Sequence, residues 1–263
     1  KDGRWTTETQ YKVLDNTLLV GHQVMLRLVS AYGFCGAYTF AKWKDAPKCK
    51  EYLYLAAYCQ EKLCHWPIGD PYLVTLNFTN LHQIMQLMMA VIADAENSFI
   101  RQLGEMLMLP ERNIGKSQAK KHSDAVGKTT IYDKKARRAA EQLLAYEEKR
   151  KALKSQKNRP ATWICYAQGA LAVLDGDEAA LDTALRGYVQ ALRGSGKPVK
   201  DLAPHLLAHY AVFLAKMAVR RGMEVTIDTV DCPQELIQTI PADYSGLTLP
   251  RPRDGFPWER KQG

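Results

Sequence analysis

The chain has 263 residues, of which 46% are hydrophobic, 24% charged and 9% aromatic, and its formal net charge is +8. This is the balance of an ordinary globular protein, and it excludes disordered, collagen-like and small disulfide-scaffold chains. No apolar run reaches the roughly 18 residues that suggest a membrane-spanning helix. The chain is long enough to bury one large core or two smaller ones.

The positive charge is concentrated in one segment. Residues 111–160 contain 15 Lys and Arg against 6 Asp and Glu, a balance of +9. Residues 1–110 are balanced at 10 against 10, and residues 161–263 at 11 against 12. Because a surface charge acts within about 8–10 Å at physiological salt, the basic character is a local property of this segment.

Hydrophobic residues recur at intervals of three and four along the first part of the chain, which predicts helices. The helices expected there cover residues 11–32, 49–64, 80–93 and 99–107. The third is apolar nearly all round, so we expect it to be central. Two prolines and a glycine within 66–71 interrupt the pattern, and Pro110 ends the fourth helix.

Periodicity fails from Glu111 to Tyr132, where Lys, Ser, Gly and Thr dominate. This composition predicts a mobile basic loop over 111–132 and a boundary between two subdomains. An N-terminal helical subdomain would then occupy residues 1–110 and a C-terminal one residues 133–263, the two packed as one compact unit.

The second part of the chain has the most regular helical pattern. Expected helices cover residues 133–151, 160–174, 177–192 and 201–221, with Asp133, Asp177 and Asp201 as N-caps. The short connections between the last three predict antiparallel neighbours, as in a multi-helix bundle or in helical-hairpin layers. Residues 225–227 are expected to be a short strand or extended segment, residues 233–237 a last helical turn, and the proline-rich tail extended. The fold class predicted is therefore mainly α.

The six cysteines do not suggest a disulfide framework, which is found mainly in short secreted chains. We therefore expect reduced thiols and a cytoplasmic protein. The chain begins with Lys1 rather than Met, so we expect an original N-terminus to be missing, which leaves open a signal peptide removed before Lys1.

Two groups of residues have the chemistry of metal ligands. His205 and His209 stand four apart on an expected helix, where two imidazoles could share a metal, but no glutamate base or third ligand accompanies them. Cys59, Cys64 and His65 lie close together in a spacing that matches no common zinc site. We interpret both groups as structural and expect no metal and no cofactor.

Known catalytic motifs are not matched. Gly127-Lys128-Thr129 resembles the end of a phosphate-binding loop, but His122 occupies the position of the required earlier glycine and no strand precedes it. No local signature of serine, cysteine or paired-carboxylate catalysis is present. We expect a protein without catalysis of its own, and a metal at His205 and His209 would be the main support for an enzyme.

The basic segment is the feature that most clearly suggests a partner. Its cations include Lys116, Lys120, Lys121, Lys128, Lys134, Lys135, Arg137 and Arg138. A phosphate backbone would suit them electrostatically, but Tyr132 is the only aromatic residue between Glu111 and Tyr146, so platforms for base stacking are scarce. Three interpretations stay open: a solvated loop, a site for an acidic protein, and a nucleic-acid site.

Several segments of the last third carry a family resemblance. They are Trp163, Ala170–Asp177, Leu181, Ala184–Leu185, Phe213–Val225 and Pro233–Ile237. Together they resemble the C-terminal half of the immunity protein 49 family. That family consists of mostly α-helical bacterial proteins, encoded beside polymorphic toxins, that bind their cognate toxin and neutralise it. Residues 1–130 match no motif, and the family supplies no site residue to place on this chain.

The resemblance implies an immunity protein that blocks its toxin by direct stoichiometric contact. The candidate contact residues are Lys120, Lys121, Lys128, Lys134, Arg137 and Arg138 of the basic segment. Trp66 and Tyr72 of the aromatic-proline loop are a second candidate, for which the alternative is a buried corner of the fold. Because the chain is basic, mimicry of a nucleic acid by overall charge is not expected. The alternative is a helical nucleic-acid-binding or regulatory protein that uses residues 111–160.

Overall fold

The structure is a computed structural model that describes residues 16–64, 80–107, 118–153, 160–194, 207–240 and 242–247. Its helices are α2 (Asn16–Trp43), α3 (Ala46–Cys64), α5 (Asn80–Ile92), α6 (Asn97–Leu107), α7 (Gln118–Thr130), α8 (Ala136–Lys151), α9 (Thr162–Asp175), α10 (Glu178–Arg193), α12 (His209–Arg220) and α13 (Gln234–Ile237). In the described ranges the only β-type pairing is an isolated bridge between Thr229 and Cys232. The predicted mainly α fold is confirmed.

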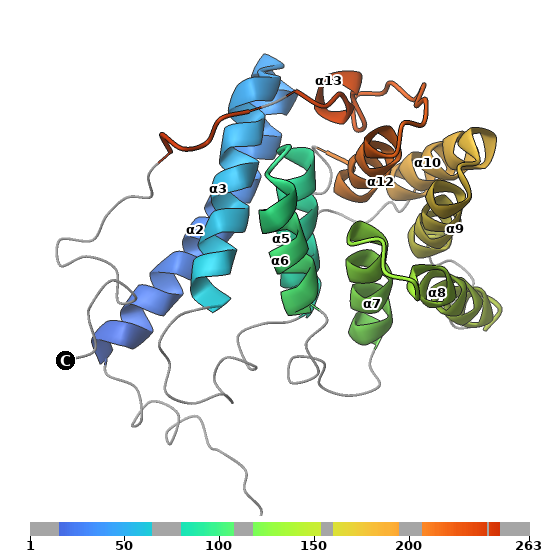
Figure 1. The fold of residues 1–263 in the computed structure, drawn as a ribbon, viewed down its shortest axis with the longest axis horizontal. Helices are drawn as coiled ribbons and strands as arrows, with labels where there is room; N and C mark the ends of the chain where they lie inside the picture. Colours follow the sequence, from blue (N-terminus) through green and yellow to red (C-terminus); the bar gives the residue numbers. More distant parts are fainter. Residues whose placement is uncertain are drawn as a thin grey trace, which may run out of the picture.

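The helices form a side-by-side arrangement around α5 (Figure 1). The long α2–α3 hairpin stands on one side, and α7 to α10 with α12 stand on the other. Consecutive helices pack on each other, α7 on α8, α8 on α9 and α9 on α10, while α5 contacts α3, α6, α7 and α12. Ile84, Leu87, Met88, Val91 and Ile92 are all fully buried, as expected for a central helix.

One hydrophobic core includes residues from both sides of the segment 111–132, where the sequence predicted a boundary between subdomains. It extends from Ala37 in α2 to Ile237 in α13 and includes residues of α7 and α8. A smaller cluster, with Met25 and Leu63 among its members, lies between α2 and α3. Residues on both sides of the segment 111–132 thus share a core.

The prediction of a loop over 111–132 is wrong for residues 118–130, which form helix α7. The buried side of α7 presents His122, Ala125, Val126 and Thr129. These side chains are small or polar, so no stripe of large apolar residues marks the helix in the sequence. Residues 111–117 lie outside the described part of the chain.

Two predicted N-caps are described, and they differ. Asp177 caps α10, accepting the Ala180 N–H at 2.9 Å, as predicted. Asp133 does not cap α8: its carboxylate accepts the Lys135 N–H at 2.7 Å, and Lys135 itself takes the N-cap position. The Asp133 carboxylate therefore stabilises the turn that precedes α8, and it does not bind the free N–H groups in the first turn of α8. Asp201 lies outside the described residues.

Residues 225–227 are extended but pair with no strand of the described chain. The Gln234 side-chain amide instead donates to the carbonyls of Val225 and Ile227, each at 2.8 Å. One side chain thus satisfies carbonyls that a neighbouring strand would otherwise bond. The predicted last helical turn is confirmed as α13, and prolines 241, 250, 252 and 257 lie outside the described residues.

A buried ionic cluster fixes the chain after α13 against the core. The ammonium groups of Lys50 and Lys216 lie 2.8 and 2.6 Å from Asp94 Oδ2, and all three side chains are at most 3% exposed. Both lysines also donate to the Gln238 carbonyl, at 3.1 and 2.8 Å. Because buried charges persist only when they are paired, the cluster ties α3, the turn after α5 and α12 to this segment.

Cys35, Cys49, Cys59, Cys165 and Cys232 are free thiols. Burial raises the pKa of Cys49 and of Cys59 to about 12, which keeps these thiols protonated. In the ranges that the structure describes, no helix combines the length and the apolar character that a membrane crossing needs.

Candidate partner-binding surface

The turn from α7 to α8 brings exposed cations to one corner of the molecule. Ala136, Ala139, Ala140 and Leu143 face the core, so their neighbours on the helix must point outward. Lys134, Lys135 and Arg138 are exposed. We call these three residues the basic corner. They form no ion pair with any carboxylate in the described part of the chain.

The other predicted cations of α7 and α8 have internal partners. Lys121 lies 4.1 Å from the centre of the Tyr146 ring, and Lys128 lies 3.6 Å from Asp124. Arg137 binds both carboxylate oxygens of Asp175, and this bond holds the pKa of Asp175 below its ordinary value. These three cations are therefore less available to a partner than the basic corner.

The remaining predicted contact residues receive no side-chain description. Lys120 belongs to α7, but its side chain lies outside what the structure describes. Trp66 and Tyr72 lie in the undescribed segment between α3 and α5. Of the predicted set, Lys134 and Arg138 are the exposed cations for which the described residues supply no ion-pair partner.

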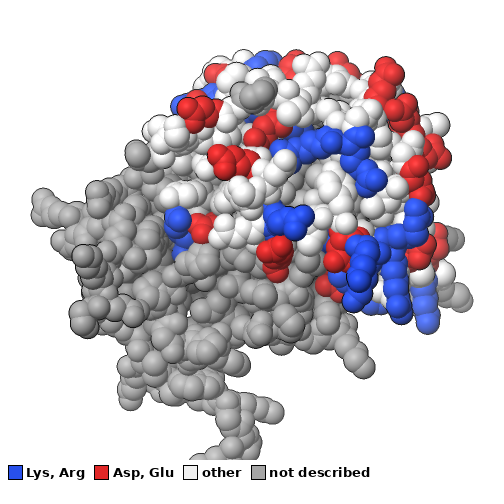
Figure 2. Space-filling view, viewed as in Figure 1, with Lys and Arg blue, Asp and Glu red and all other residues white. Residues whose placement is uncertain are grey.

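Charge is unevenly distributed over the visible face of the molecule. Figure 2 shows Lys and Arg side chains gathered over α8 and Asp and Glu side chains gathered over α10. The two signs are also mixed along α8 itself, where Glu141 and Glu148 are exposed beside the cations.

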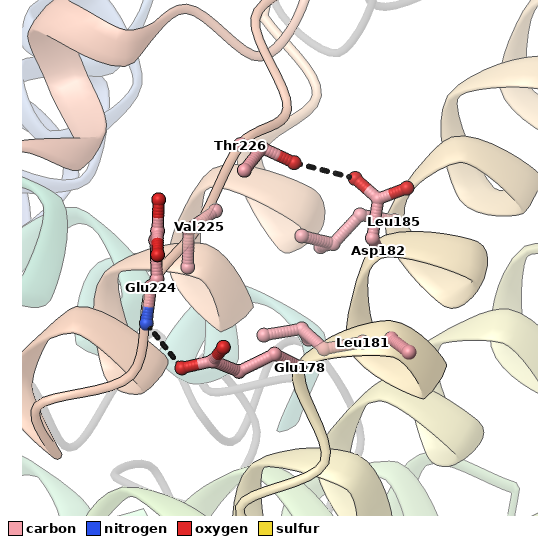
Figure 3. A pocket seen from close by; sticks show the side chains of 8 residues that line it. Glu178, Leu181, Asp182, Leu185, Glu224, Val225 and Thr226 are labelled. Carbon is pink, nitrogen blue, oxygen red and sulfur yellow. Dashed lines mark hydrogen bonds between the residues drawn. The ribbon is translucent and has the colours of Figure 1, made fainter.

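An acidic hollow of about 340 Å³ lies between α10 and the extended segment that follows α12 (Figure 3). Glu178 accepts the Glu224 N–H at 2.6 Å, and Asp182 accepts the Thr226 hydroxyl at 3.2 Å. Asp182 is also bound by Arg186 at 2.6 Å. These bonds attach the extended segment to α10, so the carboxylates have a structural use. Among the described residues no group of His, Cys, Asp and Glu is arranged to hold a metal.

A second hollow, of about 650 Å³, lies between α6, the α7–α8 turn and α12. Arg101, Tyr132 and Arg220 line it together with apolar side chains. None of these residues was predicted as a site residue, because they come from three separate segments. The Arg220-Arg221-Gly222 run signals a helix end in the sequence, and no pattern there signals a binding site.

The predicted metal-ligand groups are placed only in part. His209 is buried at the start of α12, and burial lowers its pKa to about 4, so the imidazole is neutral at pH 7. Cys59 is buried in the α2–α3 cluster. His205 and His65 lie outside the described residues.

No protein-family model, curated protein or solved structure matches this chain. The surface itself, together with the sequence, is therefore the basis for a function.

Proposed function

We propose that this protein is an immunity protein that binds a cognate bacterial toxin in the cytoplasm and neutralises it by direct stoichiometric contact, without catalysis of its own. The sequence support is the resemblance to the immunity protein 49 family. The segments Ala170–Asp177 and Phe213–Val225 that carry it form the end of α9, its turn into α10, and α12 with the chain that follows.

The observation that carries the proposal is the exposed positive charge of the basic corner, which pairs with no carboxylate among the described residues. Lys134 and Lys135 lie on a turn whose backbone is fixed, since the Asp133 N–H donates to the Lys128 carbonyl at 2.9 Å and the Asp133 carbonyl accepts from the Ala136 N–H at 2.8 Å. Arg138 lies in the first turn of α8. Helix α8 is itself held between α7 and α9. A fixed backbone adds little to the conformational entropy lost on binding, so that loss is confined to the lysine and arginine side chains themselves. Arginine is frequent among the residues that dominate interface energies.

The distribution of charge favours a protein partner over a nucleic acid. A phosphate backbone offers uniform negative charge and rewards uniform positive charge. On α8, exposed Glu141 and Glu148 lie among the cations, and three of the predicted cations are already engaged within the chain. A mixed surface of this kind matches a protein surface that also carries both signs.

Neutralisation by contact needs an interface of about 1,600 Å² in total. The basic corner is one part of such an area, and its exposed charges would steer the toxin to the surface as well as hold it. The toxin surface facing the corner is then expected to be acidic.

The test uses the polypeptide encoded by the reading frame adjacent to this gene. The two chains are co-expressed and purified through a tag on the neighbour, and survival of cells expressing the neighbour is scored with and without this protein. A one-to-one complex together with restored survival supports the proposal. If no complex forms and the cells are not protected, the proposal is wrong. Binding to unrelated duplex DNA that weakens steeply with salt would instead support the nucleic-acid alternative.

A further inference from the structure

The hollow between α6, the α7–α8 turn and α12 combines a fixed cation with an apolar floor. Ile100, Ile131, Met217 and Val219 supply the apolar side chains. Its volume of about 650 Å³ is within the range of sites that hold small ligands or side chains of a partner. Figure 2 shows Lys and Arg side chains near the middle of this face, with some Asp and Glu side chains beside them.

Arg220 is held in place by the α5–α6 connection and the first residue of α6. Its Nη1 donates to Asn97 Oδ1 at 3.3 Å and its Nη2 to the Ala95 carbonyl at 3.2 Å. Each terminal nitrogen of a guanidinium carries a second hydrogen, and Nε carries another. In the described chain no further acceptor binds Arg220, so these hydrogens are available to a ligand in a fixed position.

Tyr132 forms a wall of the hollow in a strained backbone conformation. Its φ of +52° is in the left-handed region, which a tyrosine seldom adopts. The side chain is 44% exposed, its hydroxyl donates weakly to the Met217 carbonyl at 3.5 Å, and the Arg221 guanidinium lies 4.9 Å from its ring centre. Strained residues persist where their surroundings fix them and are frequent in ligand sites.

The charge around the hollow is positive. Arg101 and Arg220 line it, and Arg221 lies against the Tyr132 wall. The carboxylate paired with Arg101 is that of Glu105, at 4.0 Å, and both side chains are more than half exposed. A pair of this exposure and distance is weak, so Arg101 can turn to a stronger acceptor.

We propose that this hollow binds a carboxylate side chain within an acidic peptide segment of the partner protein. Arg220 takes the carboxylate with two donors, Arg101 closes over it, and the apolar neighbours of the acidic residue rest on the floor beside Tyr132. The apolar floor favours a peptide over a phosphate, which would bring no apolar group to cover it. The inference rests on the proposed function only in naming the occupant as part of a partner protein.

The test is a calorimetric titration of this protein with a capped hexapeptide of alternating glutamate and leucine, with the same peptide carrying glutamine in place of glutamate as the uncharged probe. We expect the acidic peptide to bind and the glutamine peptide to bind at least about tenfold more weakly, the loss typical of a charged hydrogen bond. Inorganic phosphate serves as a second probe and should bind more weakly than the acidic peptide.

Variants locate the peptide. Arg101→Gln and Arg220→Gln should each weaken acidic-peptide binding, with Arg220→Gln at least about tenfold weaker. Arg186→Gln is the matched control, because Arg186 is also an exposed arginine paired with an acid at i,i+4. Thr239→Glu places a competing carboxylate at the exposed rim and should also weaken binding, which keeps the test valid if Arg220→Gln is unstable.

The inference is wrong if the acidic peptide does not bind, if the variants bind it as the unchanged protein does, or if phosphate binds more tightly than the peptide. These outcomes are independent of the toxin assay. If the acidic peptide does not bind but the neighbouring polypeptide is still neutralised, only the peptide site is excluded. If the acidic peptide binds but no polypeptide is neutralised, only the proposed function is excluded.

Discussion

The ammonium group of Lys216 on α12 lies 2.6 Å from the Asp94 carboxylate, although 122 residues separate them in the chain. Lys50 shares the same carboxylate oxygen, so two buried cations depend on one buried anion. The carbonyls of Leu236 and Gln238 accept further hydrogen bonds from Lys216, at 3.3 and 2.8 Å. The charge balance of the core therefore depends on Asp94 and on the position of the chain after α13.

Asp94→Asn should destabilise the protein strongly. Asparagine accepts the left-handed backbone that Asp94 adopts, with φ +58°, so the change removes only the charge. Below pH 7, where Lys216 carries its proton, two buried ammonium groups are then left without a carboxylate, and breaking a buried pair costs about 3–5 kcal/mol. The free energy of unfolding, measured by urea denaturation, reports the loss. Asp182→Asn is the control: its pair with Arg186 is exposed, and it should lose at most about 1 kcal/mol.

The stability of the folded protein should depend on pH through Lys216. Burial lowers the pKa of this lysine from its ordinary 10.5 to about 7, although the nearby Asp94 opposes the shift. Between pH 7 and pH 10.5 Lys216 keeps its proton in the unfolded chain but has released it in the folded chain. The unfolding free energy should therefore rise with pH through this window, by at most about 1.4 kcal/mol per pH unit.

Lys216→Met separates this contribution from that of other groups. The difference in unfolding free energy between the unchanged protein and Lys216→Met should increase from pH 7 to pH 9 in favour of the unchanged protein. A difference that is constant over this range contradicts a lowered pKa for Lys216.

Trp163 connects α7, α9 and α12. It stacks on His122 with ring centres 3.6 Å apart, and its edge contacts with Tyr166 and Tyr210 have centres 5.5 and 4.8 Å apart. Trp163→Ala should lower the unfolding free energy by about 3–5 kcal/mol, as removal of a large aromatic side chain from a packed site does. Trp163→Phe keeps part of the stack and should lose clearly less. If Trp163→Phe and Trp163→Ala lose the same unfolding free energy, the ring contacts that phenylalanine can keep contribute little to stability.

Two positions test the left-handed backbone directly. Gly176 ends α9 with φ +71°, and a Cβ added there would meet nothing within 4 Å. Gly176→Ala should therefore cost about 1–2 kcal/mol through the backbone alone.

Lys44 follows α2 with φ +56°, and Lys44→Gly should raise the melting temperature. A lower melting temperature for Lys44→Gly would indicate that the contact of its ammonium with the Phe40 ring outweighs the strain.

Much of the fold could be predicted from apolar stripes and caps. The stripe of α10 and its cap Asp177 placed that helix correctly, and the apolar circumference of α5 indicated its central position. The same rule failed for α7, because its buried side is made of alanine, valine, threonine and histidine. Small and polar residues are buried here because neighbouring helices pack over them. A local sequence pattern does not show that packing.

The binding surface was predictable only in part. A sequence shows where charge lies but not whether it is already paired across the fold. The Asp124–Lys128 pair has the i,i+4 spacing from which it could have been predicted, whereas Arg137 meets Asp175 only because α8 packs on α9. Tyr132 and Arg220 come together through tertiary packing in the same way.

The most direct test of the central claim is the affinity between this protein and the polypeptide of the adjacent reading frame, measured by calorimetry for two charge-reversal variants. Lys134→Glu with Arg138→Glu reverses the basic corner. Lys149→Glu with Lys151→Glu reverses as much charge at the other end of α8, roughly 16 Å or more along the helix axis. Binding should be at least about tenfold weaker for the first pair and less than about threefold weaker for the second. Equal affinities for the two variants would contradict the claim that the basic corner binds the partner.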